Sequence, residues 1–103
     1  DCEGAILAGH NVGFDIAMID AECKRRSLKY LSKVASHRKL DTQSLSYLDV
    51  LTGRTKSAGL AAMGDLYPEL CREGEQHDAL SDARASLRLA RVYRDMWTAA
   101  VRP

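Results

Sequence analysis

A short apolar run and a helical pattern follow one another at the start of the chain. Residues 5–9 are continuously apolar and end at a polar pair, which is typical of a buried strand in a parallel sheet. Residues 14–26 contain neither Pro nor Gly, and their apolar side chains recur about every 3.6 residues, as in an amphipathic helix. The residues of that apolar face are Phe14, Met18 and Ala21, flanked by Ile16, Ile19 and Cys23. We therefore expect a strand followed by a helix that packs on a sheet.

The middle of the chain predicts a second strand and two further helices. Residues 37–40 form the strand, after which Asp41 or Thr42 caps a helix that stops at Gly53. Residues 57–66 predict another short helix. The apolar positions are Leu45, Leu48 and Leu51 in the first helix, and Leu60, Met63 and Leu66 in the second.

The longest helix is predicted over residues 78–100. Apolar side chains recur there at i, i+3, i+7 and i+10, and three more widen the stripe. These residues are Leu80, Ala83, Leu87 and Ala90, with Leu89, Tyr93 and Trp97. The outer face of the helix carries Arg84, Arg88, Arg91 and Arg94.

The order of these elements predicts an α/β fold with about two parallel strands and four helices. The two strands would be joined by a right-handed crossover through the first helix. A parallel pair needs both faces covered and its edges paired or protected. We therefore expect a truncated portion of a larger sheet.

The charges of the chain nearly balance, but they are unevenly distributed. Fifteen Lys and Arg residues oppose fourteen Asp and Glu residues, so affinity for a polyanion has to come from local patches. One stretch holds seven basic residues and no acid: Lys24, Arg25, Arg26, Lys29, Lys33, Arg38 and Lys39. Two interpretations stay open, a solvated face or a groove that follows the backbone of a single strand of nucleic acid.

The cysteines and the apolar segments bear on the compartment. Cys2, Cys23 and Cys71 are odd in number and widely spaced, which argues against a disulfide framework and a structural zinc site. No apolar run approaches the roughly 20 residues that a membrane span needs. The first residues show no charged-then-apolar pattern, so we expect no leader peptide among them. We expect a cytoplasmic protein with reduced thiols.

Two acids and one histidine are candidates for chemistry. Asp15, at the start of the first helix, can bind Mg²⁺ or Mn²⁺ together with substrate phosphates. Alternatively, it can be a first-turn acid whose charge interacts favourably with the helix dipole. His77 precedes Asp82 by five residues at a loop-to-helix boundary, so its imidazole can act on a metal-bound water while Asp82 holds the ion. Both residues could instead be ordinary solvated side chains. Asp78 shares a helix face with Asp82, but we expect it to stabilise the helix N-terminus.

Two segments resemble known motifs. The sequence HNVGFD at residues 10–15 resembles the second motif, and HDALSDA at 77–83 the third, of the DEDDh 3′–5′ exonucleases. That family contains the proofreading ε subunit of bacterial DNA polymerase III, RNase T and oligoribonuclease. Residues 40–42 and 57–60 are similar to other segments of the family, and the chain lies along the C-terminal two thirds of such a domain. The resemblance implies a ribonuclease-H-like exonuclease fold.

The same resemblance implies a role for each motif residue. Asp15 and Asp82 would be ligands of a two-metal site for Mg²⁺ or Mn²⁺, and His77 the general base. His10, Asn11 and Phe14 would face the terminal nucleotide at the 3′ end of single-stranded DNA or RNA. From the residues alone, Phe14 could be core, and His10 and Asn11 could simply end a strand.

The chain departs from the family in its first motif, an Asp-x-Glu that supplies two more metal-binding carboxylates. Asp1-Cys2-Glu3 spells this motif but lies only seven residues before Asn11, which leaves no room for the intervening strands. We therefore expect residues 1–103 to be a partial exonuclease domain, containing the second and third motifs only, that binds metal weakly and turns over little. The alternative is a catalytically degenerate module that binds nucleic acid or a polymerase partner. In either case the open edge of the first strand predicts self-association.

Overall fold

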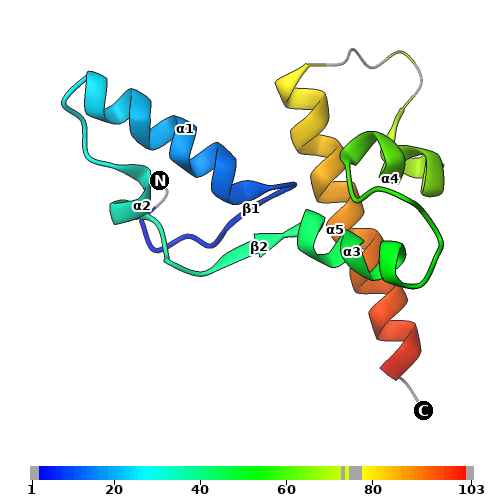
Figure 1. Ribbon diagram of the computed structural model, residues 1–103. Helices are drawn as coiled ribbons and strands as arrows, with labels where there is room; N and C mark the ends of the chain where they lie inside the picture. Colours follow the sequence, from blue (N-terminus) through cyan, green and yellow to red (C-terminus); the bar gives the residue numbers. More distant parts are fainter. Residues whose placement is uncertain (1–2, 73, 75–77, 102–103) are drawn as a thin grey trace.

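The computed structural model describes residues 3–72, 74 and 78–101. The chain forms two parts that meet at the ends of two short strands, with α1 and α2 on one side and α3, α4 and α5 on the other (Figure 1). The elements, in chain order, are β1 (Leu7–Gly9), α1 (Val12–Arg25), α2 (Leu31–Val34), β2 (Lys39–Asp41), α3 (Thr42–Leu51), α4 (Leu60–Leu66), the 3₁₀ helix η1 (Pro68–Leu70) and α5 (Ala79–Val101).

The two strands pair in parallel, as predicted from the sequence. Leu7 lies opposite Lys39, and Gly9 lies opposite Asp41. Helix α1 connects the strands and contacts both of them. Because the strands run parallel, the residues that follow β1 and β2 emerge at the same edge of the pair. That edge brings the segment after Gly9 next to the start of α3.

Helix α1 is confirmed, but the apolar face predicted for it is only partly covered. Val12 and Ile16 are buried. Phe14 and Met18 are 59% and 60% exposed. The helix turns its Ile16 side inward, whereas Phe14, Met18 and Ile19 line an open cleft.

Helix α3 is also confirmed, together with its cap, but it packs with the opposite face from the one predicted. The backbone N–H of Gln43 donates to the side chain of Asp41, which is the N-cap residue. Leu48 and Leu51 are 55% and 80% exposed. The buried residues of this helix are Thr42, Ser46 and Asp49. The prediction failed because these polar side chains find hydrogen-bond partners inside the protein, as described below.

A small core joins α4, η1 and α5. Its buried residues are Met63, Tyr67, Leu70, Ala85 and Leu89, with Leu60, Ala62, Leu66, Val92 and Tyr93 packed against them. Leu89 and Tyr93, two of the apolar positions predicted for α5, are confirmed as part of this core, whereas Leu80 and Leu87 are more than half exposed. Trp97 is exposed as well. The actual core face is rotated relative to the predicted one because α4 and η1 cover only one side of the helix.

The number of helices also differs from the prediction. The described residues contain five α-helices and one 3₁₀ helix, where the sequence predicted four helices. Helix α2 has only four residues, too few to show a periodic pattern. Pro68 opens η1, where its missing N–H costs nothing, and Arg88 donates to the carbonyl oxygen of Leu70 at its end.

Two further expectations concern the thiols and the membrane. Cys23 and Cys71 are free, as predicted, and Cys2 lies outside the described residues. No helix in the described part of the chain combines the length and apolar composition that a membrane span requires.

Candidate functional site

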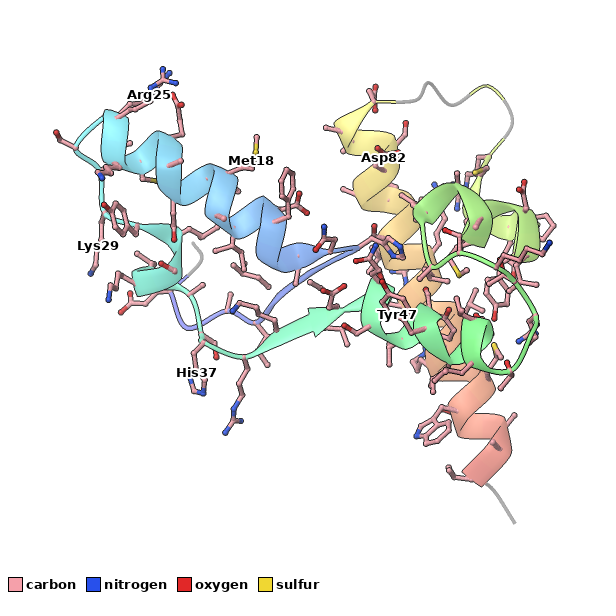
Figure 2. The ribbon with its side chains drawn as sticks, viewed as in Figure 1. Met18, Arg25, Lys29, His37, Tyr47 and Asp82 are labelled. Atoms are coloured by element: carbon pink, nitrogen blue, oxygen red, sulfur yellow. The ribbon has the colours of Figure 1, made fainter. Side chains whose placement is uncertain are left out.

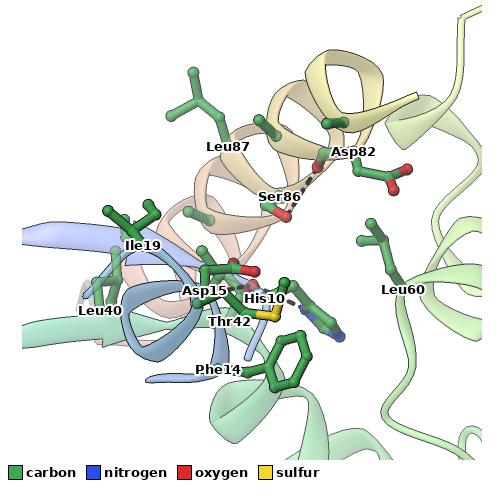
Figure 3. A pocket seen from close by; sticks show the side chains of 16 residues that line it. His10, Phe14, Asp15, Ile19, Leu40, Thr42, Leu60, Asp82, Ser86 and Leu87 are labelled. Atoms are coloured by element: carbon green, nitrogen blue, oxygen red, sulfur yellow. Dashed lines mark hydrogen bonds between the residues drawn. The ribbon is translucent and has the colours of Figure 1, made fainter. Parts of the chain in front are cut away.

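A cleft of about 710 Å³ separates α1 from the first half of α5. Asp15 stands on the α1 wall, and Asp82 stands on the α5 wall (Figure 3). Most of the remaining lining is apolar and includes Phe14, Met18 and Leu87. The fold thus brings two carboxylates, 67 positions apart in the sequence, to one apolar opening.

The carboxylate of Asp15 lies over the end of β1. It belongs to the first turn of α1, and its Oδ2 is 3.5 Å from the position that a Cβ on Gly9 would occupy. The side chain is exposed to the cleft. Its place follows directly from the tight turn at His10 and Asn11 that links strand to helix.

One carboxylate oxygen of Asp41 holds this turn in place. Asn11 adopts the left-handed conformation, with φ 65° and ψ 51°, which Asn tolerates better than most residues. Its backbone N–H donates to Oδ1 of Asp41 at 2.9 Å. The same oxygen accepts the N–H of Gln43 at 2.9 Å. Asp41 therefore ties the start of α1 to the start of α3, and Asp15 follows only four residues after Asn11.

The ring of His10 is held on both sides. Its Nε2 lies 2.6 Å from the carbonyl oxygen of Ala58, which can only accept, so this nitrogen carries the proton and donates it. Its Nδ1 lies 2.9 Å from the hydroxyl of Thr42. His10 lines the cleft, yet its two nitrogens connect β1, α3 and the segment before α4. In this arrangement it shapes the wall of the cleft through these contacts.

Asp78 and Asp82 lie in different environments. The backbone N–H of Ser81 donates to Oδ1 of Asp78 at 2.8 Å, which is the hydrogen bond of a helix N-cap. That backbone hydrogen bond holds the pKa of Asp78 below its usual value. Asp82 lies one turn further along, is exposed and lines the cleft. Below it on the same wall, the buried hydroxyl of Ser86 donates to the carbonyl oxygen of Asp82 at 3.0 Å.

The other candidate residues are placed differently. Phe14 lines the cleft and is 59% exposed. Asn11 is exposed, but it is not one of the described residues that line the cleft. His77 lies outside the described residues. The structure thus places His10, Phe14, Asp15 and Asp82 around one opening.

The two carboxylates suit a divalent cation. Mg²⁺ and Mn²⁺ prefer oxygen ligands, and Mg²⁺ is commonly held by one or two carboxylates, with water and substrate phosphates completing the shell. Within residues 3–72, 74 and 78–101, no group of three or more His, Cys, Asp or Glu side chains comes together as a metal cluster. Asp15 and Asp82 both line the cleft, and their carboxylate oxygens are the type of ligand that these ions prefer.

Sequence reasoning missed two of the contacts that build this site. It identified Asp41 only as a helix cap, and it did not connect His10 with Thr42 or Ala58. A signal existed in the two polar pairs, His10-Asn11 and Asp41-Thr42, each of which follows a short apolar or extended segment. In a parallel pair such residues meet at one edge.

A comparison with protein families gives a match over most of the chain. The family model described as exonuclease, of the RNase T type, matches residues 2–90. Neither the curated proteins nor the solved structures gave a significant match. The matched range includes β1, the start of α1 and the first turns of α5, all of which contribute residues to the lining of the cleft.

Proposed function

The chain belongs to the exonuclease family, and we propose that its cleft is the place where a nucleic acid is hydrolysed from the 3′ end in the presence of Mg²⁺ or Mn²⁺. The observation that carries this proposal is the meeting of Asp15 and Asp82 at one opening. Both carboxylates are exposed where they line the cleft, so each is open to a cation from solvent. A cation bound there would attract the phosphate of the substrate.

Each residue of the two motifs has a distinct proposed task. Asp15 and Asp82 would hold the cation, and the cation would supply stabilisation of negative charge on the reacting phosphate. His77 takes the proton from the water that attacks the terminal phosphorus, because an imidazole with a pKa near neutrality is suited to that step. The bond from phosphorus to the 3′ oxygen of the preceding nucleotide breaks, that oxygen is protonated, and a nucleoside 5′-monophosphate leaves. Phe14 offers an exposed aromatic face on which the terminal base stacks.

A two-metal version of this site needs more carboxylates than Asp15 and Asp82 provide. We propose that an Asp-x-Glu strand supplies them by pairing with the side of β1 that faces away from β2. In the described part of the chain β1 pairs only with β2. Ile6, Met18 and Leu87 are exposed apolar side chains that such a strand would cover. In its absence the same edge would accept a second copy of the chain or a polymerase subunit.

The alternative function is binding without hydrolysis, in which the cleft holds a 3′ end for a partner such as a polymerase. The two functions differ in their products. The hydrolytic function predicts that a single strand labelled at its 5′ end shortens one nucleotide at a time in the presence of Mn²⁺. A strand labelled at its 3′ end should release labelled mononucleotide at once.

The test uses Asp15→Asn beside the unchanged chain, each also with an Asp-x-Glu strand placed ahead of residue 1 in the same polypeptide. Hydrolysis that requires this added strand and is lost in Asp15→Asn supports the enzyme. Binding of the strand without any release of mononucleotide in all four proteins supports the alternative. His77→Ala should lower the rate on the order of 10²-fold while leaving Mn²⁺ affinity nearly unchanged.

A further inference from the structure

The positive charge of the protein is concentrated at one end. Residues 23–40 contain seven Lys and Arg residues and no Asp or Glu, so the other 85 residues hold eight basic and fourteen acidic side chains. All seven are exposed. We call this set the basic end, and its members are Lys24, Arg25, Arg26, Lys29, Lys33, Arg38 and Lys39. It comprises the last turn of α1, the segment through α2 and the beginning of β2, and Figure 2 shows Arg25 and Lys29 on the far side of the molecule from Asp82.

The nearest acids reduce this charge only slightly. Glu22 lies 3.1 Å from Arg25 and 2.9 Å from Arg26, and these surface pairs are open to solvent. Asp20 accepts the backbone N–H of Ser32, and its pKa is lowered by hydrogen bonding to Ser32. Counted with these two acids, the seven basic side chains leave a formal charge of about five positive units.

One face of α1 connects the cleft with the basic end. Phe14, Met18, Ala21 and Arg25 follow one another at intervals of three or four residues, so they share a helix face. All four are exposed, and Phe14 and Met18 line the cleft. From Phe14 to Arg25 the helix rises about 16 Å. Figure 2 shows Met18 and Arg25 on the same side of the helix.

We propose that the basic end binds the phosphate backbone of a single-stranded nucleic acid whose 3′ end occupies the cleft. The inference rests on the proposed function, and it specifies the substrate as a strand of several nucleotides rather than a dinucleotide. The chain as a whole carries a formal charge of only +1, so the attraction of a polyanion has to come from a local patch. Bases stack on the apolar part of the α1 face, and phosphates pair with the Lys and Arg side chains beyond it.

The test compares two double charge reversals that change the net charge equally. Lys29→Glu with Lys33→Glu alters the basic end, and Arg91→Glu with Arg94→Glu alters exposed positions on α5. Binding of a fluorescein-labelled 12-nucleotide single strand is measured by anisotropy between 50 and 200 mM KCl. EDTA is present, so no hydrolysis occurs. A 3-nucleotide strand is measured in parallel, and circular dichroism checks that each variant is folded.

We expect the Lys29 and Lys33 variant to bind the 12-nucleotide strand at least tenfold more weakly at 50 mM KCl. The slope of log affinity against log salt should fall by about 1.4, since each phosphate contact on a single strand contributes about 0.7. The α5 variant should change affinity less than threefold, and the 3-nucleotide strand should bind all proteins alike. Equal weakening by both variants would overturn the proposal, because it would show only an effect of net charge.

Two further outcomes separate this inference from the proposed function. If Asp15→Asn abolishes hydrolysis and retains salt-dependent binding of the 12-nucleotide strand, both proposals stand. If no protein hydrolyses the strand, but only the basic-end variant loses binding, the inference stands and the hydrolytic function fails. Displacement of the strand by poly-glutamate at an equal concentration of charge would contradict the inference and indicate an acidic protein as the partner.

Discussion

At the scale of single residues, Asp41 connects the starts of two helices that are far apart in the sequence. One of its oxygens accepts the N–H of Gln43, which caps α3, and the N–H of Asn11, which precedes α1. The cap could be predicted from the sequence because it depends on neighbours two residues apart. The contact with Asn11 could not, because it spans thirty positions and exists only when β1 and β2 pair in the observed register.

We expect Asp41→Ala to destabilise the chain by about 0.5–2 kcal/mol, which is the usual range for loss of an N-cap. It should also weaken Mn²⁺ binding, because the turn that positions Asp15 loses its partner. Asp41→Asn keeps an accepting oxygen and should recover most of both losses. Urea unfolding and Mn²⁺ titration of the two variants give the comparison. Equal stability and equal affinity in Asp41→Ala and the unchanged chain would show that this oxygen does not hold the site together.

At the scale of helices, α3 shows why an apolar pattern can point the wrong way. Its buried Asp49 accepts from the hydroxyls of Tyr67 and Tyr93 at 2.8 and 2.7 Å and pairs with Arg54 at 3.1 Å. Buried Ser46 lies 3.0 Å from the Tyr93 hydroxyl. With these partners a polar face can be buried at little cost, whereas an unpartnered one cannot. Periodicity assigned Leu48 and Leu51 to the core because it carries no information about partners on α4 and α5.

The two tyrosines give this network a pH dependence. Burial, followed by the hydrogen bond to Asp49, raises the pKa of Tyr67. Burial also raises the pKa of Tyr93, far above its usual range. A group whose pKa is higher in the folded state keeps its full contribution to stability below the unfolded pKa, near 10 for tyrosine, and loses it as the pH rises further.

We therefore expect the thermal midpoint of the chain to fall steeply above about pH 10. In Tyr93→Phe the midpoint should be lower at neutral pH, because Asp49 loses a donor, and should fall less steeply in alkali. Tyr47→Phe is the control, since that side chain is exposed. The check is a series of melting curves from pH 7 to 11.5. The same alkaline slope in Tyr93→Phe and the unchanged chain would contradict the assigned role of this tyrosine.

At the scale of the whole molecule, the chain is more open than its length suggests. Its radius of gyration is 15.4 Å, compared with about 13 Å for a compact domain of 100 residues. The order of the elements and the parallel pairing were predictable, because they depend on local patterns and short connections. The faces of α1, α3 and α5 that the rest of the protein covers could not be predicted in full. The apolar faces of α1 and α5 that periodicity assigned to the core instead line the cleft, with Phe14 and Met18 on one wall and Leu87 on the other.

We expect the 103-residue chain to associate through this opening and the free edge of β1. Sedimentation velocity should show a mass that increases with concentration. Ile6→Lys, beside β1, should reduce the association. Leu51→Lys, at a more exposed position on α3, should leave it unchanged. A chain that stays monomeric at all concentrations, or that responds equally to both substitutions, would show that the opening is not the contact surface.

The central claim is that the cleft between α1 and α5 is the hydrolytic site, and the two acids at the start of α5 test it most directly. Asp82→Asn removes a carboxylate from the cleft, whereas Asp78→Asn retains an oxygen that caps the helix. Both substitutions remove one negative charge within four residues of each other. The measurement is the Mn²⁺-dependent release of mononucleotides from a single strand by a polypeptide in which an Asp-x-Glu strand precedes residue 1. We predict that Asp82→Asn abolishes the release and that Asp78→Asn keeps it; normal release by Asp82→Asn would contradict the assignment.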